Sequence, residues 1–336
     1  MYNKINLMIS NSNKFDETNK IFENNIFKKC NALSLTLKNK IADPSKINEC
    51  KNLIKNNTST FSNFRGNNLL MTATNLSLEP FPEQTFKDLL EITNKLKVEF
   101  LNSQYLTLAA WVIYNSREKY SIDESIKNMR KSYNIMKNNH FFLTGSDDYT
   151  AAAMIATTSI NLDRTFIEIE ECYDILSANG FSKGNNLQSL SHILSLENGT
   201  SKEKCDKVIA LNNILKSNKA PLKSYSLPLL GVAPFVTNDY KEFCKNYIET
   251  INELKSHKGF GSFSLNSEIR KMIAAALVCS KYVDELNYSD NNNNNNNNNK
   301  IIETTNNTAL TIVMAMEAAS AAAAASAAAA ASASSN

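Results

Sequence analysis

The chain has 336 residues, of which 43% are hydrophobic and 21% are charged, as expected for a packed soluble protein. Its 36 basic and 33 acidic residues give a net charge of +3, which excludes the dense basic surface that non-specific binding of nucleic acid requires. Only 8 glycines and 6 prolines are present, too few for an all-β fold with a turn about every 8–12 residues.

Residues 1–24 are polar, and we expect them to form an N-terminal segment outside the main domain. The chain starts without the apolar stretch of a signal peptide. Its six cysteines are far apart and include no C-x-x-C pair, a pattern typical of single buried thiols in a reducing compartment. We therefore expect a cytoplasmic protein.

Residues 25–288 are predicted to form a domain of helical hairpins that repeat about every 40 residues. Apolar residues recur in register near the ends of five amphipathic segments: Leu96, Met136, Leu176, Leu215 and Leu254. Two further columns keep the same steps: Phe86, Ile126, Phe166, Cys205 and Cys244, then Leu89, Met129, Ile169, Val208 and Tyr247. Within one repeat, Ile126, Met129 and Met136 lie on one helix face.

Each repeat also contains an earlier and more apolar segment. These predicted inner helices span residues 67–77, 104–116, 147–158, 185–196 and 224–235. The third is small and apolar nearly all round, which is typical of a helix buried on every side, so the amphipathic helices would form an outer wall. Further helices are predicted at 25–40, 45–56 and 268–284.

The fold class is therefore predicted to be all-α, with about seven helical hairpins of period ~40 in a curved α-solenoid or α/α-toroid-like array. The sequence does not choose between the two shapes.

Residues 289–300 contain an asparagine run without apolar surface to bury, and we expect a disordered insert. Residues 301–336 are rich in alanine and serine, and alanine has the best helix propensity. They are predicted to form a helix with a frayed end that completes the last hairpin. A membrane span is the alternative, but Glu317 and the small apolar surface of alanine argue against it.

The sequence contains no established catalytic motif and no Cys/His spacing that suits zinc. We therefore expect no metal and no cofactor. The glutamates Glu168, Glu170 and Glu171 lie on an outer helix and are interpreted as a solvated face.

The turns before the inner helices are rich in Ser, Asp, Asn and Gly, and their first interpretation is helix capping. In a curved array, however, equivalent turns would line up on one rim, and helix N-termini favour polar or anionic ligands. The candidate ligand-binding residues on this rim are Arg65, Asn67, Gln104, Tyr105, Asp147, Asp148, Lys183, Asn185, Asn186, Gln188, His192, Lys223 and Tyr225.

Two pairs within this set could do more than cap a helix. Asp147 and Asp148 suggest acid–base chemistry, although adjacent carboxylates on an α-helix point about 100° apart. Gln188 and His192 lie one turn apart on a helix that should be buried, where such a pair is unexpected. The weak catalytic candidates are therefore Asp147, Asp148 and His192.

Several motifs resemble an uncharacterised, largely bacterial family catalogued as domain-of-unknown-function family 4003. They are Phe64–Gly66, Phe142–Tyr149, Gly180–Leu194, Pro228–Gly231 and Gly259–Ser262. The resemblance covers about residues 25–331, and the stretch FSKGNNLQSLSH is its most specific part. It implies that these residues form one unit, and it implies no activity.

The leading functional prediction is a soluble binding or interaction module that holds a small polar ligand, a peptide or a protein on the rim. One alternative is an enzyme whose toroid-like pocket acts on a polar small molecule or glycoside by acid–base chemistry. The other is a scaffold attached to a membrane by the C-terminal helix, which we do not favour.

Overall fold

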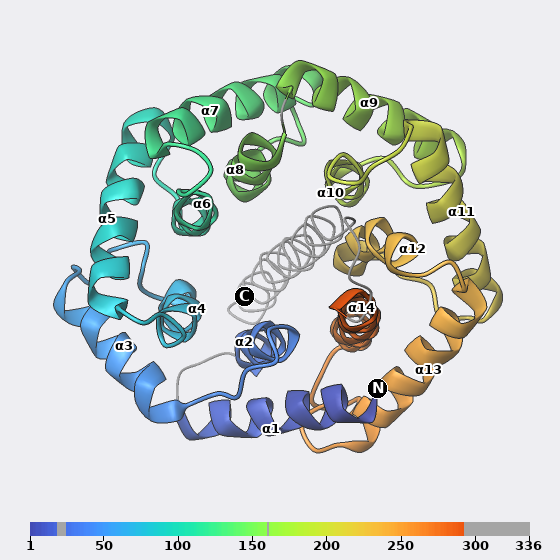
Figure 1. Ribbon diagram of the computed structural model, residues 1–336, viewed down its shortest axis with the longest axis horizontal. Helices are drawn as coiled ribbons and strands as arrows, with labels where there is room; N and C mark the ends of the chain where they lie inside the picture. Colours follow the sequence, from blue (N-terminus) through green and yellow to red (C-terminus); the bar gives the residue numbers. More distant parts are fainter. Residues whose placement is uncertain (19–24, 160, 292–336) are drawn as a thin grey trace, which may run out of the picture. The chain divides into compact units, whose positions relative to one another are not determined.

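The computed structural model of the protein describes residues 1–18, 25–159 and 161–291 (Figure 1). Regular structure in these residues is entirely helical, with fourteen α-helices, two 3-10 helices and no strand. The prediction of an all-α protein is therefore confirmed. The predicted C-terminal helix at 301–336 and all but the first residues of the insert at 289–300 lie outside the described residues.

The described chain divides into two compact units. The N-terminal unit consists of Ser10–Leu35 and Lys40–Phe166, and the C-terminal unit consists of Met1–Ile9, Thr36–Asn39 and the chain from Ile167 onward. The first helix thus contributes to both units.

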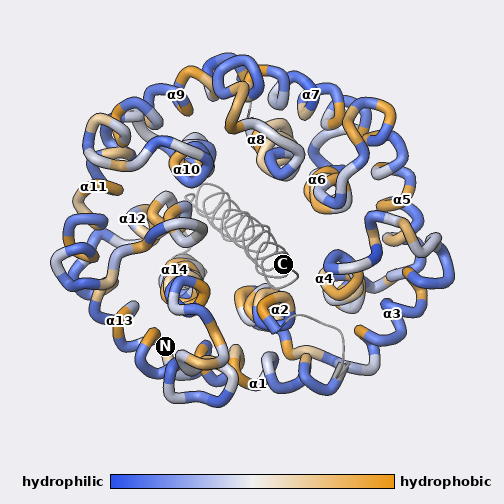
Figure 2. Tube along the Cα trace, turned by 180° about the vertical axis from the view of Figure 1, so that it is seen from behind, coloured by the Kyte–Doolittle hydropathy of each residue, from blue (hydrophilic) through white to orange (hydrophobic). Residues whose placement is uncertain are grey.

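The N-terminal unit alternates long and short helices. Its elements are α2 (Asn25–Leu37), α3 (Pro44–Asn56), α4 (Asn67–Leu76), α5 (Pro82–Glu99), α6 (Tyr105–Asn115), α7 (Ile122–Asn139), the 3-10 helix η1 (Ser146–Asp148) and α8 (Tyr149–Thr158). The long helices α3, α5 and α7 form one layer and each contacts the short helix that follows it, α4, α6 or α8 (Figure 1). The residues of α5 and α7 alternate between hydrophilic and hydrophobic along the chain (Figure 2), as expected for helices with one face on a core and one in water.

The C-terminal unit repeats the same alternation with one exception. Its elements are α9 (Leu162–Ala178), whose first turn belongs to the N-terminal unit, then α10 (Asn185–Leu194), α11 (Ser201–Ser217), η2 (Ser224–Gly231), α12 (Ala233–Val236), α13 (Tyr240–Ser256) and α14 (Ser267–Asn291). The predicted inner helix at 224–235 is wrong, because the chain forms the 3-10 helix η2 followed by the single turn α12. Pro228 lies inside η2 and lacks the N–H that an α-helix would need at that position.

The apolar columns of the repeat are the core of the long helices. Leu96, Met136, Leu176, Leu215 and Leu254 are each at most 1% exposed. The column of Leu89, Met129, Ile169, Val208 and Tyr247 is equally buried. The 40-residue pattern therefore reports the packing of successive long helices against the short ones.

The polar N-terminal residues form the helix α1 (Tyr2–Thr18), and Ile5, Met8 and Phe15 on it are buried. Its start is fixed by Lys4, which is 7% exposed. The Lys4 ammonium donates to Ser280 Oγ at 2.9 Å and lies 2.8 Å from the Asp284 carboxylate. The first residues of the chain are thus packed against α14 within the C-terminal unit.

All six cysteines are buried and outside disulfides. Cys172 and Cys205 lie next to each other, because Cys205 Sγ donates a hydrogen bond to the carbonyl oxygen of Cys172 at 3.8 Å. No helix in the described part of the chain combines the length and the apolar character that crossing a membrane requires.

Candidate functional site

Side-chain caps occur on four of the long helices and are missing at the cap positions of four short ones, although the long helix α5 also begins without one. Asp43, Ser121, Thr200 and Asp239 each accept a hydrogen bond from a backbone N–H in the first turn of α3, α7, α11 or α13. The short helices α4, α6, α8 and α10 begin without a side-chain cap. The capping interpretation of the turns before the inner helices holds in part, because Ser103 Oγ accepts from the Tyr105 N–H at 3.4 Å and Ser226 Oγ accepts from the Lys223 N–H at 2.9 Å. The glycines that precede α4 and α10 offer no side-chain acceptor at the cap position.

Two glycines explain how the chain enters two of the uncapped helices. Gly66 precedes α4 with φ 58°, and Gly184 precedes α10 with φ 137°. Both values lie in the region that residues with a Cβ atom rarely adopt. The sharp entry replaces the extended backbone of an ordinary N-cap, so the residue before the helix cannot present a capping side chain.

Two asparagines join the turn before α4 to the turn before α6. The Asn63 amide donates to Asn102 Oδ1 at 2.7 Å and to the Ser103 carbonyl at 2.8 Å. The buried Asn68 amide donates to the Gln104 carbonyl at 2.8 Å. Neither asparagine was among the predicted site residues, although both lie beside predicted ones, and together they hold neighbouring turns in register.

Arg65 has a structural role that its position in the turn did not reveal. Its guanidinium donates to Thr58 Oγ1 at 2.9 Å and to the carbonyls of Lys55 and Thr58 at 2.7 Å. These acceptors lie at and just after the end of α3, where carbonyls lack helical partners. Asn67 and Gln104 remain exposed at the starts of α4 and α6.

The adjacent residues Asp147 and Asp148 both fold back toward Gly145. Asp148 Oδ2 accepts a hydrogen bond from the Gly145 N–H at 2.9 Å. Asp147 Oδ1 would lie only 2.6 Å from a Cβ atom at Gly145, so the carboxylate occupies space that only glycine leaves open. The two residues belong to the 3-10 turn η1 and not to an α-helix, and successive side chains of a 3-10 helix point about 120° apart. The groups meet around Gly145 because each carboxyl group bends back toward that residue.

Two tyrosines, Tyr105 and Tyr133, feel the charges of both carboxyl groups. Burial raises the pKa of each of these hydroxyls, and the charges of Asp147 and Asp148 raise it further. Tyr149 directly follows Asp148, and its ring lies 5.1 Å from that of Tyr133, edge to face. We call these five residues the aspartate–tyrosine cluster: Tyr105, Tyr133, Asp147, Asp148 and Tyr149.

The electrostatics of the cluster favour a protonated carboxyl group at Asp148. Burial, with a smaller contribution from Asp147, raises the pKa of Asp148 to about 7, although the Gly145 N–H and Lys137 oppose the shift. Close to neutral pH the cluster can therefore hold one proton that it can donate or share.

Asp148 is expected to make the protein less stable as the pH rises. Its folded pKa lies above its unfolded value, so the native state binds more protons between about pH 4 and pH 7 and loses stability through that window. In the wild type the free energy of unfolding should fall by on the order of 1–2 kcal/mol between pH 5 and pH 8, measured by urea unfolding. Asp148→Asn should abolish this fall. Asp163→Asn, which removes an exposed carboxylate of the same unit, should keep the wild-type slope. Equal slopes in wild type and Asp148→Asn would contradict the assignment.

In the C-terminal unit the predicted ligand-binding residues fall into an exposed group and a buried pair. Lys183, Asn185, Asn186 and Lys223 are exposed near the starts of α10 and η2. Gln188 and His192 are 1% and 2% exposed and both make contacts inside the fold. The Gln188 and His192 side chains therefore do not reach the solvent in this structure. Tyr225 lies in η2, and its side chain is outside the described part of the chain.

A buried lysine that the sequence pattern did not reveal links α9, α10 and α11. Lys204 is 1% exposed, and its ammonium donates to the Leu194 and Glu197 carbonyls at 3.0 Å and to Glu168 Oε2 at 3.2 Å. Glu171 accepts a hydrogen bond from Ser201 at 2.6 Å. The interpretation of these glutamates as a solvated face is therefore incomplete, since Glu168 is only partly exposed and binds Lys204, and the exposed Glu171 also bonds the start of α11.

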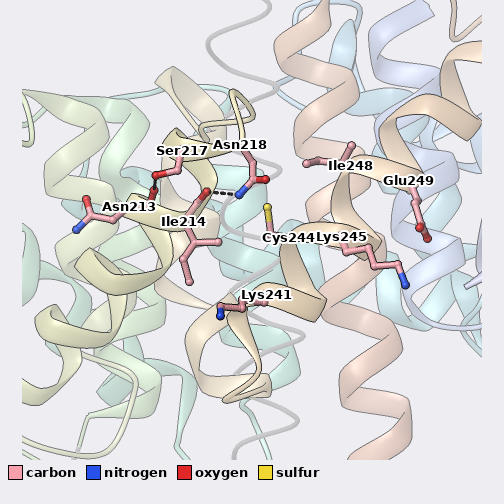
Figure 3. Close-up of a pocket in the computed structure, with 9 residues that line it drawn as sticks. All are labelled: Asn213, Ile214, Ser217, Asn218, Lys241, Cys244, Lys245, Ile248 and Glu249. Atoms are coloured by element: carbon pink, nitrogen blue, oxygen red, sulfur yellow. Dashed lines mark hydrogen bonds between the residues drawn. The ribbon is translucent and has the colours of Figure 1, made fainter.

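The open grooves of the molecule lie elsewhere. The largest of three described here has a volume of about 690 Å³ and lies between α11 and α13 within the C-terminal unit (Figure 3). Ser217 and Asn218 on its wall use their side chains to bond the Asn213 and Ile214 carbonyls of their own helix (Figure 3). Similar grooves separate α5 from α7 and α3 from α5. None of the predicted site residues lines these three grooves, which are the furrows between successive long helices.

No cluster of metal-binding side chains occurs among the residues that the structure describes.

These observations define an all-α protein in which long and short helices alternate with a 40-residue repeat. Residues 14–319 match the family described as "Protein of unknown function (DUF4003)", so the chain belongs to that family. It is similar to "Uncharacterized protein YeaA" of Bacillus subtilis (strain 168), with 26% identity over 239 residues that cover 69% of this chain and 70% of that protein. No solved structure matches the chain.

Proposed function

We propose that the protein is a binding module whose ligand contacts the turns before the short helices. In this proposal the hairpins, from about residue 25 to residue 288, stack into a curved α-solenoid or α/α-toroid-like array that gathers those turns on one rim. The observation that carries the proposal is that α4 and α10 each start at a glycine with positive φ and have no capping side chain. Uncapped N–H groups in the first turns of these two helices are donors available to a polar ligand.

Among the turns before the short helices, the one before α8 carries the carboxyl groups of the aspartate–tyrosine cluster, which combines them with aromatic rings. Its carboxyl groups can accept hydrogen bonds from hydroxyl or amino groups, and tyrosine rings can pack against the C–H faces of a sugar or against a cation. Such a set of groups favours a small ligand with several hydroxyl or amino groups over an anion, because the cluster itself is acidic.

The raised pKa of Asp148 supports a second candidate function, which is acid–base chemistry on the same kind of ligand. A carboxyl group that titrates near neutral pH is a suitable general acid. Asp147 would then hold the second carboxylate of the pair. We rank this function below binding because no third group that would complete a catalytic arrangement lies in the cluster.

The test is a thermal-shift titration of the full chain with maltose, glucosamine and spermidine as probes. At least one probe should raise the melting temperature of the wild type by a few degrees, as linkage predicts at a concentration well above Kd. The double variant Asp147→Asn/Tyr105→Phe should lose most of that shift, and Asp163→Asn should retain it. A shift of the same size in all three proteins would place binding outside the cluster, and no shift with any probe would contradict this ligand class.

A further inference from the structure

Large apolar side chains project from the turns that lead into the short helices of the N-terminal unit. Phe61 is 97% exposed, Leu101 82%, Phe141 62% and Phe142 96%. Exposed side chains of this size are common singly, but a group of them at one edge indicates contact with another surface. We call Phe61, Leu101, Phe141 and Phe142 the apolar tips.

The apolar tips lie on neighbouring turns that are bonded to one another. The turn carrying Phe61 is joined to the next by the Asn63 amide, which donates to Asn102 Oδ1 and the Ser103 carbonyl. That next turn, which carries Leu101, is joined to α8 by Phe100, whose ring centre lies 5.0 Å from that of Tyr149. Phe61, Leu101 and Phe141 are also 40 residues apart in the sequence, so they occupy equivalent places in successive repeats.

The exposure of these positions is not a general property of the repeat. The next equivalent residue, Phe181 in the C-terminal unit, is only 7% exposed, and the Lys216 ammonium lies 5.7 Å from its ring centre. The repeat can therefore bury an aromatic residue at this position, and it leaves three successive ones exposed in the N-terminal unit.

The arrangement suits a deformable partner. The apolar tips are separate side chains that project from turns, and none of them lines the three grooves described above. A folded protein partner would need a pocket for each tip, whereas the interfacial region of a bilayer accepts isolated phenylalanine and leucine side chains without a preformed pocket.

Charges near the apolar tips favour a negatively charged lipid surface. Lys55, Lys97 and Lys137 lie in the last turns of α3, α5 and α7, next to the tips, and the Lys137 ammonium is 4.4 Å from the centre of the Phe141 ring. Two exposed carboxylates, Glu99 and Asp147, lie on the same turns, so the positive excess is modest. Lysine side chains close to an anionic bilayer add attraction to the insertion of apolar groups.

We propose that the apolar tips insert into the surface of a membrane that contains anionic lipids, with Lys55 and Lys97 contacting the head groups. Attachment of this kind lies at the interface and requires no spanning helix. It goes beyond ligand binding by the aspartate–tyrosine cluster, because it depends on exposed side chains that do not belong to the cluster.

The experiment is co-sedimentation of the full chain with vesicles of phosphatidylcholine alone or mixed with phosphatidylglycerol. The wild type should sediment with the mixed vesicles and less with phosphatidylcholine alone. The variant Phe61→Ser/Leu101→Ser/Phe142→Ser should bind the mixed vesicles at least about tenfold more weakly, since it loses three large inserted side chains. Lys55→Gln/Lys97→Gln should weaken binding to the mixed vesicles and leave binding to phosphatidylcholine unchanged.

Two matched controls show whether sedimentation depends on the apolar tips in particular. Phe81→Ser removes a phenylalanine that is 74% exposed on the turn between α4 and α5, and it should sediment like the wild type. Asp148→Asn changes the aspartate–tyrosine cluster and should also sediment like the wild type, so that failure of the ligand proposal and failure of this one are distinguishable. Failure of the wild type to sediment with either vesicle, or equal sedimentation of wild type and triple variant, would overturn the proposal. So would a change from oligomer to monomer in the triple variant without lipid, which would show that the tips bind a second copy of the chain.

Discussion

Replacing Lys204 with methionine is expected to lower the free energy of unfolding by about 2–4 kcal/mol. Methionine keeps most of the volume of the lysine stem but removes the ammonium group that binds the Leu194 and Glu197 carbonyls and the Glu168 carboxylate. The Leu194 carbonyl ends α10 and the Glu197 carbonyl lies in the turn after it, where regular helical donors run out. The measurement is urea unfolding, and because the chain has two units, the loss should appear in the transition of the C-terminal unit if two transitions are resolved.

Lys202→Met is the matched control for this prediction. Lys202 precedes Lys204 on the first turn of α11, but its side chain is 77% exposed and its one ion pair is with Asp206 in the same helix. Exposed pairs of this kind contribute little, so the change should stay within about 0.5 kcal/mol of the wild type. If the two methionine variants were equally stable, water would have replaced the ammonium group of Lys204, and the lysine would not be the link between the three helices.

Adding a single methyl group at Gly231 should destabilise the C-terminal unit by about 1–3 kcal/mol. A Cβ atom at this position would lie 2.5 Å from Ile193 Cγ2 and 3.1 Å from Leu190 Cδ1, and both of those side chains are fully buried in α10. The helix α10 therefore packs directly on the backbone of η2, and Gly231→Ala forces the two elements apart. The same urea experiment gives the loss.

A steric clash can be separated from a loss of backbone freedom by a double-variant cycle. Ile193→Ala removes the Cγ2 atom that the new methyl group would meet, at a cost of about 2–4 kcal/mol on its own. If the clash is the cause, Gly231→Ala/Ile193→Ala should be more stable than the sum of the single effects predicts. Strict additivity would show that the methyl group acts through the backbone or the unfolded state.

The helices were predictable wherever burial follows a fixed period. Met129, Leu176 and Leu254 are buried because each points from a long helix toward the short ones, and that geometry repeats with the sequence. The period could not reveal α1, because its buried residues Ile5, Met8 and Phe15 are scattered among asparagine and lysine. The period also predicted one inner helix at 224–235, where the structure has the 3-10 helix η2 and the single turn α12. Pro228 lacks the N–H that a continuous α-helix would need there.

The candidate site was predictable as a set of turns and not in its details. Sequence placed Asp147 and Asp148 at the start of an inner helix but could not show that a 3-10 turn folds both onto Gly145. Tyr133, which completes the cluster, lies on the preceding long helix, where its place on the apolar face predicts only a core residue. Lys204 was missed for a similar reason, since a lysine on an amphipathic helix is normally solvated. A signal for it exists only in three dimensions, in the carbonyls that end α10.

The contacts of Lys4 have a consequence for the order in which the protein can be completed during synthesis. Most helices contact elements that are close in the chain, so they can find their partners as soon as each hairpin has left the ribosome. Lys4 is different, because it bonds Asn39 nearby in the chain but its partners Ser280 and Asp284 are translated 276 or more residues later. Its full set of contacts exists only when nearly the whole chain has been made. A ribosome-stalled chain that ends before α14 should therefore leave Lys4 more reactive toward an amine-specific label than the released full chain.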